Sequence, residues 1–266
     1  MLRSVFAKVV HDQWRLVLGW AAFAGIWPAM YVALYPSIGA IGELEKMLEQ
    51  FPPAIREFFA SGSLNMSTPE GFLNLELFTF VAPLLVLAYT VVVAGGATAA
   101  EEERGTMDLL LANPIPRWRI VVEKSAAFVI GTIVIGIGMW IGAGLGALAV
   151  NVDLDMGLVG QAIASSVLLG YALGGLALAL GALTGRRWLA AGVSLMVAIA
   201  GFFLNGLGAL VDWLEPWRPI SPFYQYIAND PLSNGIDPAN ALVLLGWALI
   251  GGIVAVIAFE RRDLAR

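Results

Sequence analysis

Long apolar runs alternate with short polar segments along the whole chain. A membrane-spanning helix needs about 20 predominantly apolar residues, because the hydrocarbon core of a bilayer is about 30 Å thick and a helix rises about 1.5 Å per residue. Six runs meet this length, and none of them contains Asp, Glu, Lys or Arg. The pattern therefore predicts an all-α membrane protein whose transmembrane helices lie at residues 17–35, 77–100, 125–150, 158–183, 188–211 and 241–259.

The first sixteen residues have a different periodicity. Apolar side chains fall on one helical face, at Leu2, Val5, Phe6, Val9 and Leu16. Polar side chains fall on the opposite face, which is typical of a helix that lies in the membrane surface. We therefore expect an interfacial (elbow) helix at residues 1–16, with a solvated cytoplasmic tail as the alternative.

Composition and charge agree with a membrane protein and indicate its orientation. Hydrophobic residues make up 59% of the 266 residues and charged residues 13%, whereas about a quarter of a soluble domain is charged. With a cytoplasmic N-terminus, twelve of the 15 Lys and Arg residues fall in cytoplasmic segments, as the positive-inside rule requires. We expect both termini in the cytoplasm and a single transmembrane domain over residues 1–266, in the inner (plasma) membrane. Residues 101–124 are then cytoplasmic, and residues 36–76 and 212–240 are extracytoplasmic.

The composition also excludes several function classes. The chain has no Cys and one His, His11, so thiolate sites, multi-His metal sites and Ser-His catalysis are not expected. The formal net charge of −5 argues against nucleic-acid binding. Ion-coupled carriers commonly place ionisable groups within the membrane, and the six apolar runs contain no such groups. We expect no catalytic residue, metal ligand or cofactor in this chain.

The segment after the second apolar run is the most specific feature of the sequence. Gly105 is suited to end the long helix in a left-handed conformation, and Thr106 to cap a new helix that stops before Pro114. Met107, Leu110 and Leu111 would share one apolar face of this short helix. They have no evident core of their own chain to face, so we expect them to point toward a partner. The alternative is that they dip into the membrane interface.

This segment resembles the coupling-helix region of ABC-2 type permeases, the membrane halves of ATP-binding-cassette exporters. The resemblance lies in the run from Glu103 to Leu111 and continues through residues 114–117 and Lys124. Three further matches are the surface helix before the first span and the segments at residues 221–224 and 259–264. It implies that the segment docks on an ATPase subunit. The implied ATPase-coupling residues are Glu103, Arg104, Gly105, Thr106, Met107, Asp108, Leu109, Leu110 and Leu111. Among them, Met107, Leu110 and Leu111 would be the apolar anchors.

The resemblance also implies partners. The chain contains no G-x-x-x-x-G-K-[ST] phosphate loop, so ATP and Mg are expected in a separate ATPase subunit, present in two copies. Six spans are half the usual twelve of such exporters, which implies either a second copy of this permease, as a homodimer, or a pairing with a close homologue. Membrane lipids complete the expected partners.

By the same resemblance, the first, second and fifth spans line the substrate pathway. The candidate pathway residues are Phe78, Phe80, Tyr89, Phe202, Phe203 and Asn205. For Asn205, an ordinary interhelical hydrogen bond is the alternative. An uncharged lining suits a hydrophobic or amphiphilic cargo, such as a drug, a peptide or a lipid-like molecule. Two other functions stay open, a membrane scaffold in an ABC-type maturation or assembly system without bulk export, and a passive channel.

Overall fold

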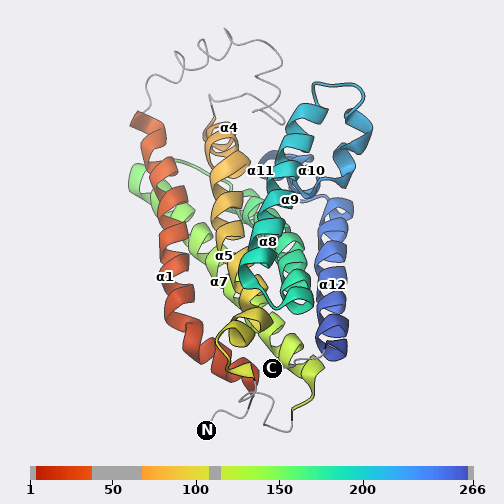
Figure 1. The fold of residues 1–266 in the computed structure, drawn as a ribbon. Helices are drawn as coiled ribbons and strands as arrows, with labels where there is room; N and C mark the ends of the chain where they lie inside the picture. The colour runs from red at the N-terminus through yellow and green to blue at the C-terminus, as the bar shows by residue number, and fades with distance from the viewer. Residues whose placement is uncertain (1–3, 38–67, 108–114, 263–266) are drawn as a thin grey trace.

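The computed structural model describes residues 4–37, 68–107 and 115–262, which form one bundle of long helices (Figure 1). The described residues contain no β-strand, and six of their helical segments are long and apolar enough to cross a membrane. The expected all-α fold with six spans is therefore confirmed. The long helices are α1 (Val5–Leu34), α5 (Ala82–Glu103), α7 (Arg117–Val150), α8 (Met156–Thr184), α9 (Arg187–Gly208) and α12 (Pro238–Arg261).

Helix α1 differs from the expectation at its start. The Ser4 hydroxyl caps it by accepting the Ala7 N–H at 3.1 Å, and the helix then continues without a break to Leu34. Among the described residues, α1 is continuous across the expected boundary between the elbow helix at 1–16 and the span at 17–35, and the placement of its first turns in the membrane surface stays a prediction. The sequence explains this continuity, because no Pro or Gly occurs between Ser4 and Gly19 to interrupt the helix.

The second span is built from three consecutive helical pieces. Thr68 caps α4 (Pro69–Leu73), the π-helix η2 (Asn74–Val81) follows, and α5 continues directly from it. A π-helix bonds residue i to i+5, which leaves local backbone carbonyls open to other donors. This span begins eight residues before the expected start at residue 77.

Short elements lie at the end of the bundle where α9 finishes and α12 begins (Figure 1). They are η1 (Tyr35–Ser37), η3 (Glu215–Ile220), α10 (Pro222–Ile227) and α11 (Pro231–Asn234). The Ser221 hydroxyl donates to the Gly201 carbonyl at 2.7 Å, which fixes the start of α10 against α9. The Asn74 amide donates to Asp230 at 2.8 Å, which joins η2 to the start of α11.

Glycines allow the long helices to approach one another closely. A Cβ on Gly138 of α7 would lie 2.5 Å from the Ala21 carbonyl oxygen of α1, and one on Gly25 would lie 2.5 Å from the Gly138 carbonyl oxygen. Side chains at these positions would force α1 and α7 apart. Gly138, Gly142 and Gly146 are spaced four residues apart in α7, and each lies against the α1 backbone, which is the packing role of small residues in membrane helices.

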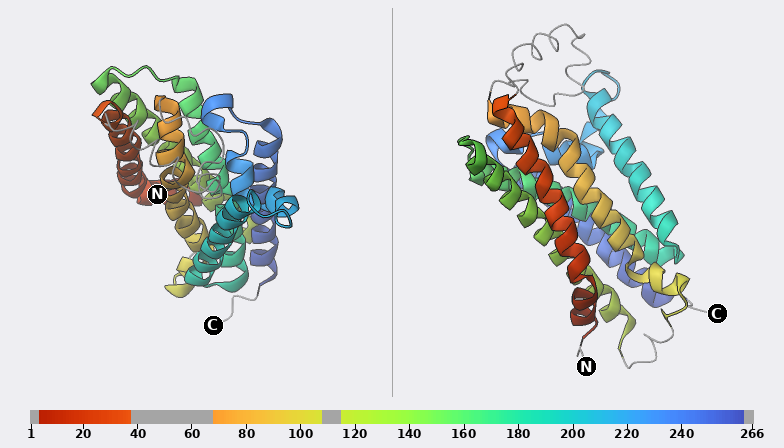
Figure 2. Two further views of the ribbon diagram at one scale, coloured as in Figure 1. Left: turned by 90° about the horizontal axis from the view of Figure 1, so that it is seen from above. Right: turned by 90° about the vertical axis from the view of Figure 1, so that its left-hand side faces the viewer.

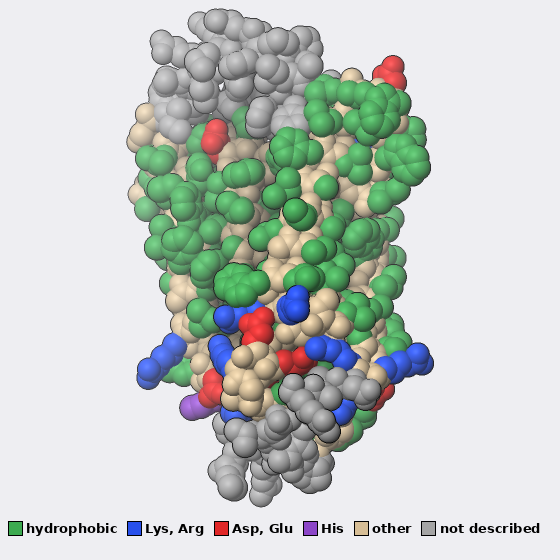
Figure 3. Space-filling model, viewed as in Figure 1, with side chains coloured by type: hydrophobic (Ala, Val, Ile, Leu, Met, Phe, Trp, Pro, Cys, Tyr) green, Lys and Arg blue, Asp and Glu red, His purple; other side chains and the backbone are tan. Residues whose placement is uncertain are grey.

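Charged residues gather at one end of the bundle, and an apolar surface covers the flank above them (Figure 3). This charged end holds the end of α5, the start of α7, the α8–α9 turn and the end of α12. The start of α1 and the end of α12 both lie at this end (Figures 1 and 2). That placement agrees with an even number of crossings. Which compartment the charged end faces stays a prediction from the positive-inside rule.

Candidate functional site

Three consecutive glutamates end helix α5 at the charged end. Successive residues of an α-helix are about 100° apart around its axis, so the three side chains leave α5 in three directions. Each carboxylate meets a cation from a different helical segment. The ion pairs are Glu101–Lys124 of α7 at 2.5 Å, Glu102–Arg262 after α12 at 2.8 Å and Glu103–Arg187 of α9 at 2.9 Å. We call these six residues the glutamate hub.

The hub compensates an unfavourable local charge. The C-terminal end of a helix carries a partial negative charge, so carboxylates in its last turn are repelled unless cations offset them. Lys124 is only 7% exposed, and its ammonium donates to the Ala97 carbonyl at 2.5 Å as well as pairing with Glu101. Lys124 therefore offsets the charge of Glu101 and also satisfies a backbone carbonyl in the last turns of α5.

The pair of Glu102 and Arg262 occupies a space that a glycine leaves open. Gly185, in the turn between α8 and α9, has a φ of +65°, and a Cβ there would overlap both the Arg262 guanidinium and the Glu102 carboxylate. The Arg262 guanidinium also donates to the Ala182 carbonyl at 3.1 Å. The Arg117 guanidinium in turn donates to the Arg262 carbonyl at 2.9 Å, which connects the end of α12 to the start of α7.

The chain leaves α5 through two backbone hydrogen bonds to the hub. Gly105 has a φ of +67°, which confirms the expected left-handed end of the helix. The Gly105 N–H donates to the Glu102 carbonyl at 3.0 Å, and the Thr106 N–H donates to the Glu101 carbonyl at 2.9 Å. This is a Schellman motif. Arg104, Gly105 and Thr106 are exposed, while the Glu103 carboxylate is engaged by Arg187 of its own chain.

Met107 differs from its expected environment. Its side chain is 4% exposed and belongs to a core cluster that includes Val121 and Phe259. Met107 thus has a core of its own chain to face, because the chain turns back toward the bundle after Gly105. Asp108, Leu109, Leu110 and Leu111, and with them the expected helix at 106–113, lie outside the described residues. The coupling role of the whole segment stays a prediction.

The opposite end holds most of the candidate pathway residues. Phe202 of α9 lies at the centre of an aromatic cluster formed by Phe80, Phe202, Phe203 and Phe223. Its ring centroid is 6.1 Å from that of Phe80, 5.9 Å from that of Phe203 and 5.6 Å from that of Phe223, all in edge-to-face geometry. The structure therefore brings residues of the second and fifth spans together, with Phe223 of α10 as an unforeseen member.

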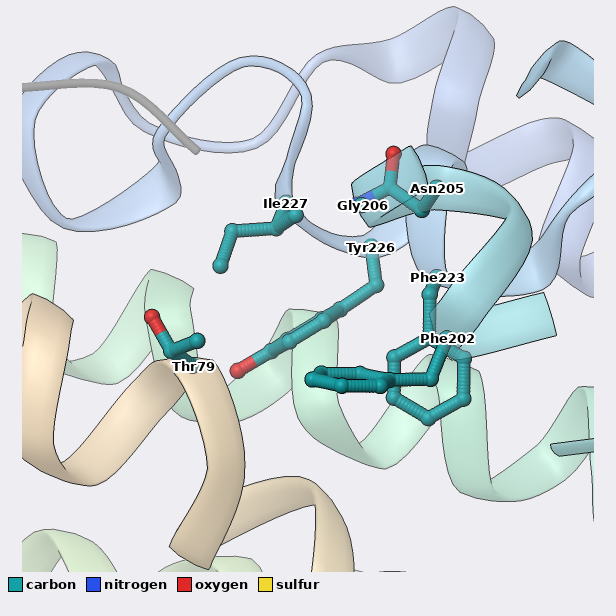
Figure 4. Close-up of a pocket in the computed structure, with 7 residues that line it drawn as sticks. All are labelled: Thr79, Phe202, Asn205, Gly206, Phe223, Tyr226 and Ile227. Carbon is teal, nitrogen blue, oxygen red and sulfur yellow. The ribbon is translucent and has the colours of Figure 1, made fainter. Parts of the chain in front are cut away.

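A small cavity adjoins the aromatic cluster (Figure 4). Its volume is about 10 Å³, which is near the minimum for a single water molecule. Asn205 lines it from α9, is 8% exposed and accepts a long hydrogen bond of 3.5 Å from Arg218. The lining residues are Thr79, Phe202, Asn205, Gly206, Phe223, Tyr226 and Ile227.

Tyr226 is a buried polar residue of this region that the sequence reasoning missed. Its hydroxyl donates to the Phe78 carbonyl of the π-helix at 2.6 Å and accepts from the Ser166 hydroxyl at 3.1 Å. Burial raises the pKa of the Tyr226 phenol above its ordinary value, and the Ser166 hydrogen bond opposes this only in part, so the phenol stays a donor. Its position two residues after the short motif at residues 221–224 was the available signal.

Four of the six candidate pathway residues lie outside the cavity lining: Phe80 and Phe203 belong to the aromatic cluster beside it, and Phe78 and Tyr89 lie elsewhere. The Phe78 side chain is buried in the core, so this residue contributes its carbonyl to Tyr226 rather than its ring to the cavity. Tyr89 is nine residues further along the same helical span than Phe80, which is about 13 Å toward the charged end. The Tyr89 hydroxyl there lies against Gly131 of α7.

Comparisons with known proteins assign the family. The model of the ABC-2 family transporter proteins matches residues 5–264. The probable ABC transporter permease protein NosY of Stutzerimonas stutzeri is 34% identical over 240 residues, which cover 76% of this chain and 84% of that protein. The uncharacterized protein YhcI of Bacillus subtilis is 24% identical over 68% of this chain and 66% of its own length. The probable multidrug ABC transporter permease YbhR of Escherichia coli is 36% identical over 76 residues, 25% of this chain and 21% of that protein. Because the match extends over nearly all of a chain with six candidate membrane spans, the chain belongs to the ABC-2 transporter family as a permease subunit.

Proposed function

We propose that this permease moves a hydrophobic or amphiphilic substrate out of the cytoplasm, driven by ATP hydrolysis in a separate ATPase subunit. The complete proposed assembly contains two permease copies and two ATPase copies in the inner (plasma) membrane, with ATP and Mg bound by the ATPases. The observation that carries the proposal is the attachment of the segment between α5 and α7. One of its ends is bonded to Glu101 and Glu102, and Arg117 at its other end is bonded to Arg262.

This attachment provides a route from a docked ATPase to the spans. A partner that binds residues 104–116 would act on a segment whose two ends connect to four long helices through the hub. ATP binding shifts the permease between two arrangements only if the ATP-bound partner has different free energies of interaction with them. A segment fixed to several helix ends supports such a difference, because each arrangement of those ends places the docking residues differently.

The opposite end supports an apolar cargo. Phe80 is 56% exposed on the flank of the bundle, and its ring packs against Phe202 within the aromatic cluster. The described cavity is too small for a drug-sized molecule. We therefore propose that the pathway opens on the flank, where a second permease copy would complete it.

Docking is tested by co-purification of the full-length permease with the ATPase encoded beside it. We expect a stable complex, and we expect Leu110→Asp to reduce ATPase recovery at least tenfold, because a carboxylate replaces an apolar anchor. Ile220→Asp, an apolar-to-acid change at the opposite end, is the matched control and should leave recovery unchanged. Equal recovery with Leu110→Asp and unchanged permease would refute the proposed docking segment.

A transport assay distinguishes export from the alternative function as a membrane scaffold. Inverted vesicles that contain the complex would be given ATP and either a fluorescently labelled phospholipid or a cationic amphiphilic dye. ATP-dependent accumulation of either probe supports export. A stable, ATP-hydrolysing complex that accumulates neither probe favours the scaffold function, and conductance without ATP favours a channel.

A further inference from the structure

We propose that Glu101, Glu102 and Glu103 act as three separate positioning residues, each of which transmits displacement of the segment after Gly105 to one helix. Glu101 would act on α7, Glu102 on α12 and Glu103 on α9. This inference rests on the proposed function, because it requires a partner that moves the segment.

The first step is the connection between the segment and the glutamates. The Gly105 and Thr106 N–H groups bond to the carbonyls of Glu102 and Glu101 at 3.0 and 2.9 Å. No flexible spacer therefore separates the exposed residues of the segment from the last turn of α5. A displacement of Gly105 and Thr106 acts directly on the backbone that carries the glutamates.

The second step is the connection between each glutamate and a helix end. Arg187 is the first residue of α9, and Glu103 accepts its backbone N–H at 2.9 Å and forms an ion pair with its guanidinium at 2.9 Å. Arg262 directly follows α12, and its two terminal guanidinium nitrogens contact the two carboxylate oxygens of Glu102 at 2.8 and 3.3 Å. Two-point contacts fix orientation as well as distance, so they transmit rotation and translation alike.

The third step concerns why these pairs are present. Partly exposed ion pairs contribute little to stability, and glutamates in the last turn of a helix act against the helix dipole. Glu102 and Glu103, whose ion pairs are partly exposed, are therefore poorly explained by stability alone. The space around one pair is also specifically shaped, because only the absence of a side chain at Gly185 leaves room for Glu102 and Arg262.

The consequence is selectivity between helices. If the pairs act separately, loss of one carboxylate uncouples the helix that it contacts and leaves the others coupled. If the hub only stabilises the bundle, loss of any one carboxylate affects all helices alike. The test therefore compares α9 with α12 in the same protein.

The chain contains no Cys, so single introduced cysteines can be labelled without background. Leu189 on α9 and Ile257 on α12 are matched label sites, since they are 41% and 46% exposed and both lie near the charged end. Each Leu189→Cys or Ile257→Cys permease would carry bimane, be assembled with its ATPase in lipid nanodiscs, and be measured without nucleotide and after trapping with ATP and vanadate. With the hub intact, we expect an ATP-dependent change in bimane emission at both sites.

Glu103→Gln should reduce the change at residue 189 at least fivefold and leave the change at residue 257 intact. Glu102→Gln should give the reverse, and Gly185→Ala should reproduce it without changing any charge. The exchange Glu103→Arg with Arg187→Glu should restore the signal at residue 189 in part, because it re-forms the ion pair but supplies no acceptor for the backbone N–H of residue 187. Arg119→Gln is the control, because it breaks an ion pair within α7 at the same end and should leave both signals intact.

The outcomes separate the two proposals. If the permease with an intact hub gives no ATP-dependent change at either site, the proposed function is contradicted and this inference fails with it. If that permease responds and the single glutamate variants lose both signals equally, or lose neither, only the inference is overturned. Should Glu103→Gln fail to fold, the charge exchange tests the same link with both ionic groups present.

Discussion

At the residue scale, several buried polar side chains form hydrogen bonds between segments that are distant in sequence. Tyr226 of α10 bonds to the Phe78 carbonyl of the π-helix and to Ser166 of α8. Asn74 and Asp230 make a second such link. Polar groups in a water-poor environment need partners, so each link orders two segments at once. Hydropathy alone did not reveal these links, because Asn74, Tyr226 and Asp230 lie outside the six apolar runs and hydropathy does not indicate which distant segments meet.

The Tyr226 link gives a prediction for a single hydroxyl. Tyr226→Phe keeps the ring but leaves the Phe78 carbonyl without its donor, so we expect a loss of about 1–3 kcal/mol in the free energy of unfolding. Denaturation in mixed detergent micelles measures this loss. Tyr224→Phe, which keeps its ring beside Arg218, is the matched control. Equal stability of the Tyr226 and Tyr224 variants would contradict the assigned hydrogen bond.

At the element scale, apolar run length predicted the spans well and their ends poorly. The second span was expected at residues 77–100, but its helix runs from Pro69 to Glu103, because Thr68 caps it at one end and the hub neutralises its glutamates at the other. Hydropathy locates the part of a helix that suits the bilayer core, whereas caps and ion pairs decide where the helix ends. The hub itself was not predicted, since its cations come from segments up to 160 residues away.

The seam between α1 and α7 gives the prediction at this scale. Gly138→Ala places a Cβ 2.5 Å from the Ala21 carbonyl oxygen of α1, which is too close, so α1 and α7 must separate. We expect a loss of about 1–3 kcal/mol in the free energy of unfolding, which is typical of overpacking. Gly144→Ala, in the same helix but with only ordinary contact to Met156, should cost much less. If both variants unfold alike, close approach at Gly138 does not stabilise the bundle.

At the scale of the whole molecule, charge is distributed asymmetrically between the two ends. The hub and the exposed arginines lie at one end, and the aromatic cluster and α10 lie at the other. This arrangement fits the proposed ATP-coupled permease, in which the contacts with the ATPase and the contacts with the cargo would be separated by the thickness of the bilayer. The sequence predicted the asymmetry from the positions of Lys and Arg, but it did not predict that three of those cations close the hub.

The asymmetry predicts the sidedness of the protein. A cysteine introduced at Arg104, which is exposed at the charged end, should react with a membrane-impermeant maleimide only in inverted vesicles. A cysteine at Trp213, exposed at the opposite end, should react only in right-side-out cells or vesicles. Reaction of the Arg104→Cys variant in intact cells would contradict the cytoplasmic placement of the charged end.

The central claim is that a separate ATPase drives this permease through the segment between α5 and α7. The most direct test is the ATP hydrolysis rate of the neighbouring ATPase, measured alone, with the unmodified permease in lipid nanodiscs, and with the Leu110→Asp permease. The account predicts that the unmodified permease changes the rate several-fold and that Leu110→Asp returns it to the rate of the ATPase alone. An ATPase rate that is the same with and without the folded, membrane-inserted permease would contradict the account.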